Sequence, residues 1–146
     1  MITQTAKKPL EDIAILTPPD LYKDLDNEFH FDFDPCPYPR PDNFDGLTCE
    51  WGKSNYVNPL FWTGGIRGRG ITAWVRKALL ESTKGKLSVM TLPLDGWVSL
   101  LPNHKNPDIR PRKDWYWLTP KGQKRKPSRP LIVWVIRPEP KEDKTI

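Results

Sequence analysis

The chain has 146 residues and a formal net charge of +5, with 37% hydrophobic and 28% charged side chains. This length predicts a single domain, and seven Trp, five Phe and four Tyr residues supply large side chains for its core, which a disordered chain would lack. No apolar run approaches the ~18 residues of a membrane helix, and the first residues lack the apolar stretch of a signal peptide. Two cysteines, Cys36 and Cys49, are too few for a disulfide scaffold or a four-ligand zinc site. These features disfavour secreted, membrane and zinc-finger proteins and predict a cytoplasmic location.

Basic side chains are concentrated in the middle of the chain. Residues 1–50 hold 4 basic and 11 acidic side chains, residues 51–104 hold 7 and 2, and residues 105–129 hold 9 and 2. Such a concentration suits a polyanionic partner such as nucleic acid. The alternative is that the basic run near residue 125 only solvates an exposed loop.

The first half of the chain predicts a helix and two strands. Thr17-Pro18-Pro19 followed by an acidic residue predicts a capped short helix over 17–25, with Leu21 and Leu25 on one face. Residues 30–34 alternate in polarity and predict a strand that Pro35 stops. Residues 54–57 predict a second short strand. We divide the chain into a flexible arm, a domain and a charged tail, at residues 1–16, 17–138 and 139–146.

The second half predicts a strand–helix–strand core. After a glycine-rich loop at 64–70, apolar residues at helical spacing from Ile71 to Leu79 predict the clearest helix of the chain. The continuous apolar run 87–92 is typical of a buried central strand. Residues 115–118 and 131–136 predict two further strands, which we expect to form an antiparallel hairpin bridged by the basic loop between them. The pattern indicates an α/β sheet covered by helices.

The most informative segment is Asn58-Pro59-Leu60-Phe61, which follows the strand 54–57. In open α/β sheets the carboxyl edge of the strands is where ligands bind. The Asn58 Oδ1 atom and the Pro59 carbonyl can accept the hydrogens of an exocyclic amine on a flipped base, and Phe61 can stack on the base. The alternative interpretation is an ordinary strand-to-loop turn.

Several short motifs, taken in order, resemble one family. They are Thr17-Pro18-Pro19, Phe31 to Cys36, Asp45-Gly46-Leu47, Val57 to Phe61, Ile71 to Ala78 and Val89 to Pro93. In order and spacing they resemble the small phage-type DNA N6-adenine methyltransferases, over residues 16–137. The resemblance implies a reduced Rossmann-like methyltransferase sheet with flanking helices, S-adenosylmethionine as cofactor, DNA as partner, and a phage or prophage gene in a bacterial host.

The resemblance also implies roles for single residues. Asn58, Pro59 and Phe61 match the catalytic motif, with Leu60 where the family usually has Pro. Thr17 and Pro18 match the element beside the methyl donor. Asp34 with Pro35 matches the acidic position near the amino-acid or ribose end of the donor, although no Gly-x-Gly turn follows it. Asp45 is a second candidate for that acidic role.

The DNA contacts are expected in two loops. Arg67 and Arg69 of the glycine-rich loop suit backbone phosphates, as do four basic residues of the loop 119–130, namely Lys121, Lys124, Arg125 and Lys126. The chain is too short for a separate target-recognition domain, which predicts little or short sequence specificity. His30 and His104 lack partners at ligand spacing, so we expect no metal. Two alternatives stay open: a catalytically degenerate phage nucleic-acid-binding protein, and a cytosine-N4 methyltransferase.

Overall fold

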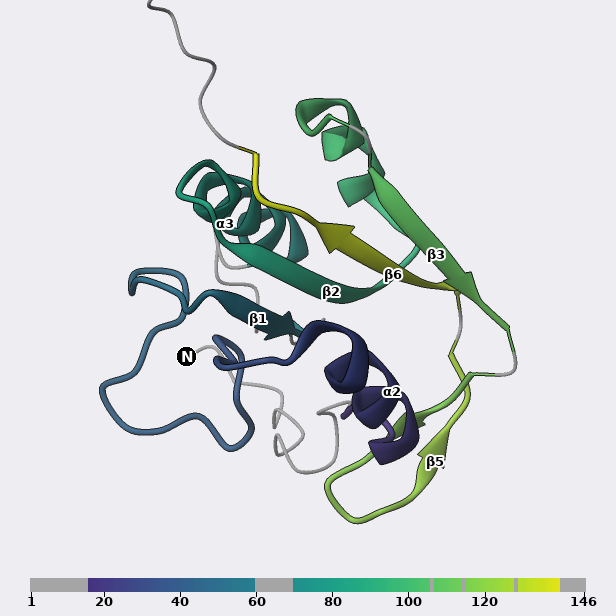
Figure 1. Ribbon diagram of the computed structural model, residues 1–146. Coiled ribbons are helices and arrows are strands. Elements are labelled where there is room, and N and C mark those ends of the chain that lie inside the picture. The colour runs from purple at the N-terminus through teal and green to yellow at the C-terminus, as the bar shows by residue number, and fades with distance from the viewer. Residues whose placement is uncertain (1–15, 60–69, 106, 114, 128, 140–146) are drawn as a thin grey trace, which may run out of the picture.

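A computed structural model describes residues 16–59, 70–105, 107–113, 115–127 and 129–139 (Figure 1). In this part of the chain the elements are α2 (Pro19–Phe29), β1 (Ser54–Val57), α3 (Ile71–Thr83), β2 (Leu87–Pro93), the 3-10 helix η1 (Gly96–Asn103), β3 (Asp108–Arg112), β4 (Trp117–Leu118), β5 (Lys124–Arg125) and β6 (Leu131–Ile136). The predicted α/β class is confirmed.

The main sheet has four strands in the order β1-β2-β6-β3. β1 and β2 are parallel and are connected through α3, whereas β6 is antiparallel to both of its neighbours, β2 and β3. It follows that β1, β2 and β3 run in the same direction, so their carboxyl ends share one edge of the sheet (Figure 1). That edge is where an open α/β sheet binds its ligands.

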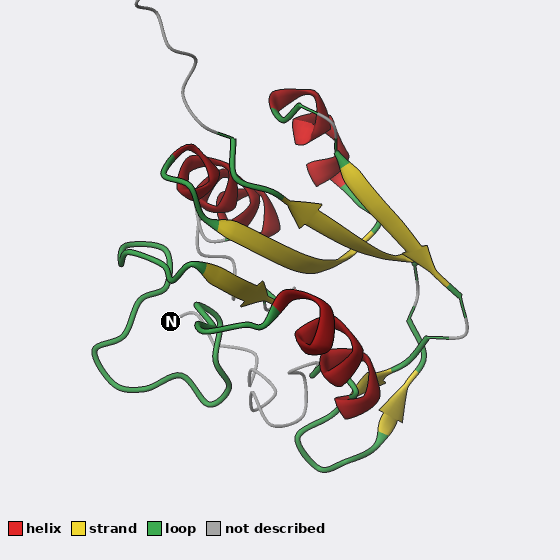
Figure 2. Ribbon diagram, in the orientation of Figure 1, coloured by secondary structure: helices red, strands yellow, loops and turns green. Residues whose placement is uncertain are grey.

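Helices cover both faces of this sheet (Figure 2). On one face α2 packs its buried side chains, Leu21 among them, against Val89 and Val133. On the other face α3 and η1 pack against Met90 and Trp134. Neighbouring residues of a strand point to opposite faces, so the two central strands are apolar at almost every position. This explains why residues 87–92 and 131–136 are continuous apolar runs in the sequence.

Five of the predicted elements are confirmed: the short helix that buries Leu21 and Leu25, the helix from Ile71, and the strands at 54–57, 87–92 and 131–136. The predicted strand at 30–34 is reduced to one parallel bridge between Phe33 and Asn55. Backbone hydrogen bonds nevertheless hold this segment along the outer side of β1, from the Asp32 and Phe33 amides to the Ser54 carbonyl.

The predicted C-terminal hairpin is wrong in its pairing. β6 pairs with β3, while residues 117–118 pair with β5 in a separate two-stranded sheet. β3 has the sequence DIRPR and lies at the sheet edge, where its side chains are only partly buried or exposed. An edge strand tolerates Pro111 because one row of its N–H groups needs no partner.

Candidate functional site

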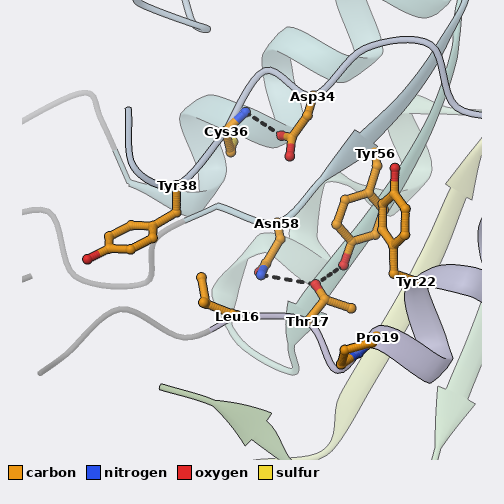
Figure 3. A pocket seen from close by; sticks show the side chains of 9 residues that line it. All are labelled: Leu16, Thr17, Pro19, Tyr22, Asp34, Cys36, Tyr38, Tyr56 and Asn58. Atoms are coloured by element: carbon orange, nitrogen blue, oxygen red, sulfur yellow. Dashed lines mark hydrogen bonds between the residues drawn. The ribbon is translucent and has the colours of Figure 1, made fainter. Parts of the chain in front are cut away.

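A pocket of about 270 Å³ opens at the carboxyl edge, where the start of α2, the end of β1 and the segment after Phe33 meet (Figure 3). Its lining residues are Leu16, Thr17, Pro19, Tyr22, Asp34, Cys36, Tyr38, Tyr56 and Asn58. Three of them, Thr17, Asp34 and Asn58, are site residues that the sequence predicted. They lie up to 41 positions apart in the chain, and the fold brings them together.

The backbone explains why these three residues meet. Asn58 follows β1 directly. The segment that ends at Asp34 runs parallel to β1, because the Tyr56 amide donates to the Phe33 carbonyl at 3.1 Å, so both chains leave the sheet at the same edge. Thr17 is held from the other side, since its neighbour Leu16 forms an antiparallel bridge to Leu118.

A chain of hydrogen bonds orients the Asn58 amide. Its Nδ2 atom donates to Thr17 Oγ1 at 3.3 Å, and Thr17 Oγ1 is hydrogen-bonded to Tyr56 Oη. Tyr56 Oη is bonded in turn to Thr91 Oγ1 of β2 at 3.1 Å, so the chain ends within the core of the sheet. Burial raises the pKa of Tyr56 well above its usual range, so this hydroxyl stays neutral. The Asn58 side chain is therefore positioned before any ligand binds.

Asp34 is the one charged side chain among the described residues that line the pocket. Its side chain reaches solvent but is largely surrounded by the pocket walls, and this burial raises the pKa of its carboxyl to about 6. The Cys36 amide, which donates to Oδ1 at 2.8 Å, lowers the pKa by a smaller amount. The rings of Tyr22 and Tyr56 lie beside it, edge to face with centroids 5.0 Å apart. A carboxylate next to aromatic faces favours a cationic ligand.

Four other predicted residues lie outside the pocket lining. Pro18 is buried ahead of α2 and Pro35 is buried after Asp34, where each shapes the backbone. Asp45 Oδ1 accepts the Leu47 amide at 3.0 Å within a turn. Pro59 is buried next to Asn58. The predicted residues Phe61, Arg67 and Arg69 lie outside the described residues, as does Leu60.

The predicted cap of α2 is also wrong. No side chain caps this helix, since the Thr17 hydroxyl is bonded to Tyr56 and Asn58 instead. A proline in the first turn starts the helix without a cap, because its fixed backbone angle suits a helical N-terminus. The Thr17 hydroxyl can therefore form its hydrogen bonds in the pocket instead of capping the helix.

The basic residues predicted to contact DNA, Lys121, Lys124, Arg125 and Lys126, are exposed around β5. The Lys124 ammonium lies 4.7 Å from the centre of the Tyr116 ring, in a cation–π contact. This hairpin adjoins the pocket, because Leu118 of β4 pairs with Leu16 of the pocket lining.

The sequence interpretation missed the aromatic part of the pocket. Tyr56 is one position inside the strand that precedes Asn58, and Tyr22 is one helical turn beyond Pro19. Both positions could have been predicted from the sequence, because Tyr56 lies near Asn58 and Tyr22 lies near Thr17, and these neighbours were predicted site residues. Cys36 also lines the pocket, and burial together with Asp34 raises the pKa of its thiol well above the usual range, so it is not a ready nucleophile.

No family model matches the chain, and no curated protein and no solved structure matches it either. Among the described residues no helix is long and apolar enough to cross a membrane. The same part of the chain holds no group of three or more His, Cys, Asp or Glu side chains suited to a metal ion.

Proposed function

We propose that the protein is an S-adenosylmethionine-dependent DNA methyltransferase that modifies the N6 amine of a flipped adenine, with little or short sequence specificity. The observation that carries the proposal is the meeting of Thr17, Asp34 and Asn58 in one pocket at the carboxyl edge of the sheet. Polar residues from three separate segments that meet in a pocket at that edge are typical of a ligand site. The parallel β1–α3–β2 unit supports our assignment of a reduced Rossmann-like sheet.

The pocket suits the proposed methyl donor in its charge. S-adenosylmethionine supplies a methyl group on a positively charged sulfur, and it also carries an ammonium group. Asp34 is the group to hold the ammonium or the ribose hydroxyls, since an ionised carboxylate accepts strong hydrogen bonds from both. The faces of Tyr22 and Tyr56 favour positive charge close by.

Asn58 is the proposed catalytic residue, together with the Pro59 carbonyl. The lone pair of an adenine amine is delocalised into the ring, so the amine is a poor nucleophile. Two acceptors on its hydrogens favour a tetrahedral nitrogen and stabilise the positive charge that grows there. The Asn58 Nδ2 atom donates to Thr17 Oγ1, and the amide oxygen, which can only accept, is the atom that we assign to this role.

The DNA partner is supported by charge and position. The exposed basic residues around β5 adjoin the pocket through the Leu16–Leu118 bridge. Such surfaces bind the phosphate backbone of a polynucleotide without recognising its base sequence. We place the activity in the cytoplasm of a bacterial host, and we propose that a phage or prophage gene encodes the protein.

The test is direct. The purified protein is incubated with S-adenosylmethionine and unmethylated DNA, and the DNA is digested to nucleosides for mass spectrometry. We expect N6-methyladenine from the wild type and about 100-fold less from Asn58→Ala, with DNA affinity changed less than about twofold. N4-methylcytosine would move the target to cytosine. DNA binding without any methylated base would identify a nucleic-acid-binding protein instead.

A further inference from the structure

A second pocket, of about 360 Å³, lies where β3 ends and β6 begins. Three of its lining residues are cationic, Arg112, Lys126 and Arg129, and Trp115 forms an aromatic part of the wall. Prolines and Leu131 complete the lining, and none of the described lining residues is acidic. Such a composition is typical of an anion site.

Two hydrogen-bond donors in this pocket have no partner in the described part of the chain. The Nε atom of Arg112 and the Nε1 atom of Trp115 are both buried. A buried donor without a partner costs about 1–3 kcal/mol, so each would be stabilised by a ligand that accepts its hydrogen. Arg129 forms an ion pair with Asp95 at 2.9 Å, but both side chains are about half exposed, so water screens that pair.

A neighbouring arginine shows that the sheet edge can satisfy such a group. Arg110 lies two positions before Arg112 on the same face of β3, and it binds Glu28 with both terminal nitrogens, at 2.7 and 2.8 Å. Its Nε atom also donates to Asp108 at 3.1 Å. Within the described residues no carboxylate is paired with Arg112, and its buried Nε atom has no partner there.

The pocket also faces the right way for DNA. β1 and β3 are parallel, so Asn58 and Arg112 lie at the same edge of the sheet. Three strand spacings separate the two strands, about 14 Å. Trp115 packs with the α2 side of the core, and so does Tyr56 of the first pocket. A strand of DNA can therefore reach both pockets on one side of the molecule.

We infer that the pocket of Arg112, Trp115, Lys126 and Arg129 binds a backbone phosphate of the DNA strand whose base enters the Asn58 pocket. The guanidinium supplies paired N–H donors, the indole supplies one more, and the lysine adds a point charge, which together match the oxygens of a phosphate. The inference rests on the proposed DNA substrate, and it does not depend on methyl transfer.

The test measures DNA binding by fluorescence anisotropy with a labelled duplex, without S-adenosylmethionine, over a series of salt concentrations. Arg112→Gln should weaken binding about tenfold at about 100 mM salt and lower the slope of log affinity against log salt by about 1. Lys126→Gln, an exposed position that cannot disturb the core, should act in the same direction. Trp115→Phe keeps an aromatic side chain but loses the indole N–H donor, and should weaken binding about threefold.

The matched control is Lys53→Gln. Lys53 is exposed and precedes β1, at the amino end of the parallel strands, so losing its charge should change affinity less than about twofold. If the Arg112 and Lys126 variants behave like this control while the wild type binds DNA, the inference is wrong. A wild type that fails to bind DNA at all would instead overturn the proposed function.

A further arm separates two sources of phosphate. Inorganic phosphate and adenosine monophosphate are titrated into the protein–DNA complex, where the anisotropy of the labelled duplex is followed, and into the free protein, where the intrinsic tryptophan fluorescence is followed. For a phosphodiester site we expect phosphate to displace the DNA only at high concentration. We also expect phosphate to displace less DNA from the Arg112→Gln variant. Tight binding of the mononucleotide through Arg112, without any change in DNA affinity, would assign the pocket to a free nucleotide and overturn the inference.

Discussion

The two pockets at the carboxyl edge differ in charge and in how their polar groups are satisfied. The pocket of Asn58 has Asp34 as its charged group, and its amide and hydroxyls are linked to one another. The pocket of Arg112 has three cations and two buried donors that no described residue accepts. One side of the edge thus favours a small cation, and the other favours an anion.

This difference teaches how so short a chain can handle two ligands of opposite charge. If both ligands shared one pocket, Asp34 would repel the phosphates of DNA and the arginine would repel the cationic donor. Separation by the width of the sheet avoids both costs. Each half of this comparison can be tested by changing the charge on one side alone.

The largest effect is expected for the affinity of the methyl donor. Asp34→Asn keeps the shape of the side chain and the acceptor for the Cys36 amide, but removes the negative charge of the pocket. We expect the Kd for S-adenosylmethionine to rise about 100-fold by calorimetry, since a hydrogen bond to a charged group contributes about 1.5–3 kcal/mol.

Asp45→Asn is the control for this substitution. It makes the same chemical change outside the pocket lining, in a turn where an amide oxygen can still accept from Leu47. The Kd should change less than about twofold. Equal losses of affinity in the two variants would mean that Asp34 affects binding through the stability of the fold. The pocket of Asn58 could then no longer be described as a site for a cationic ligand.

A smaller effect is expected on turnover from Thr17→Val. Valine fills the same volume but cannot accept from Asn58 Nδ2 or bond to Tyr56 Oη. The Asn58 amide would then rotate, and we expect kcat to fall about tenfold with little change in KM. Thr17→Ser restores the hydroxyl and should recover most of the rate. A serine variant as slow as the valine variant would show that the methyl group, and not the hydrogen bond, matters.

The basic hairpin should contribute less than either pocket, because its side chains are exposed. We expect the double variant Lys124→Gln/Arg125→Gln to weaken DNA binding about fivefold at about 100 mM salt and to lower the salt slope by up to about 2. The measurement is anisotropy, with Lys53→Gln as the control. An unchanged slope would remove the hairpin from the DNA surface and leave the Arg112 pocket as the anionic side of the comparison.

Much of this arrangement was predictable from short-range patterns. Helical spacing located α3, and continuous apolar runs located β2 and β6. Asn58 was found because it follows a short strand, which is a local signal, whereas Asp34 was implied by the resemblance of the motifs to a family.

What escaped prediction depends on contacts between distant segments. The pairing of β3 with β6 was missed because an edge strand with Pro111 has no apolar run. The Arg112 pocket was missed because its polar residues come from β3, from Trp115 and from the segment around Lys126, none of which forms a motif. Thr17 was predicted beside the donor, but its bond to Asn58 spans 41 positions and has no local signal.

The smallest expected effect is on the free energy of unfolding, which we expect the ionised Asp34 carboxylate to lower. Its pKa is raised to about 6 in the folded protein, so between about pH 4 and 6 the folded state binds more protons than the unfolded state. Stability must therefore fall as pH rises through this range, and stay lower above it. Asp34→Asn removes that loss. Because the carboxylate reaches solvent, we expect the gain at pH 7 to be only about 1 kcal/mol, or about 3 °C in Tm, and close to zero near pH 4.

Thermal melts of the wild type and of Asp34→Asn at both pH values check this. A gain that is the same at both pH values would come from packing and would contradict the raised pKa. Addition of S-adenosylmethionine should then reverse the order of stability at pH 7, since a ligand that binds only the wild type tightly stabilises it in proportion to the logarithm of its concentration over Kd. A carboxylate that lowers the stability of the free protein and raises that of the complex belongs to a binding site, whereas a structural carboxylate would stabilise both.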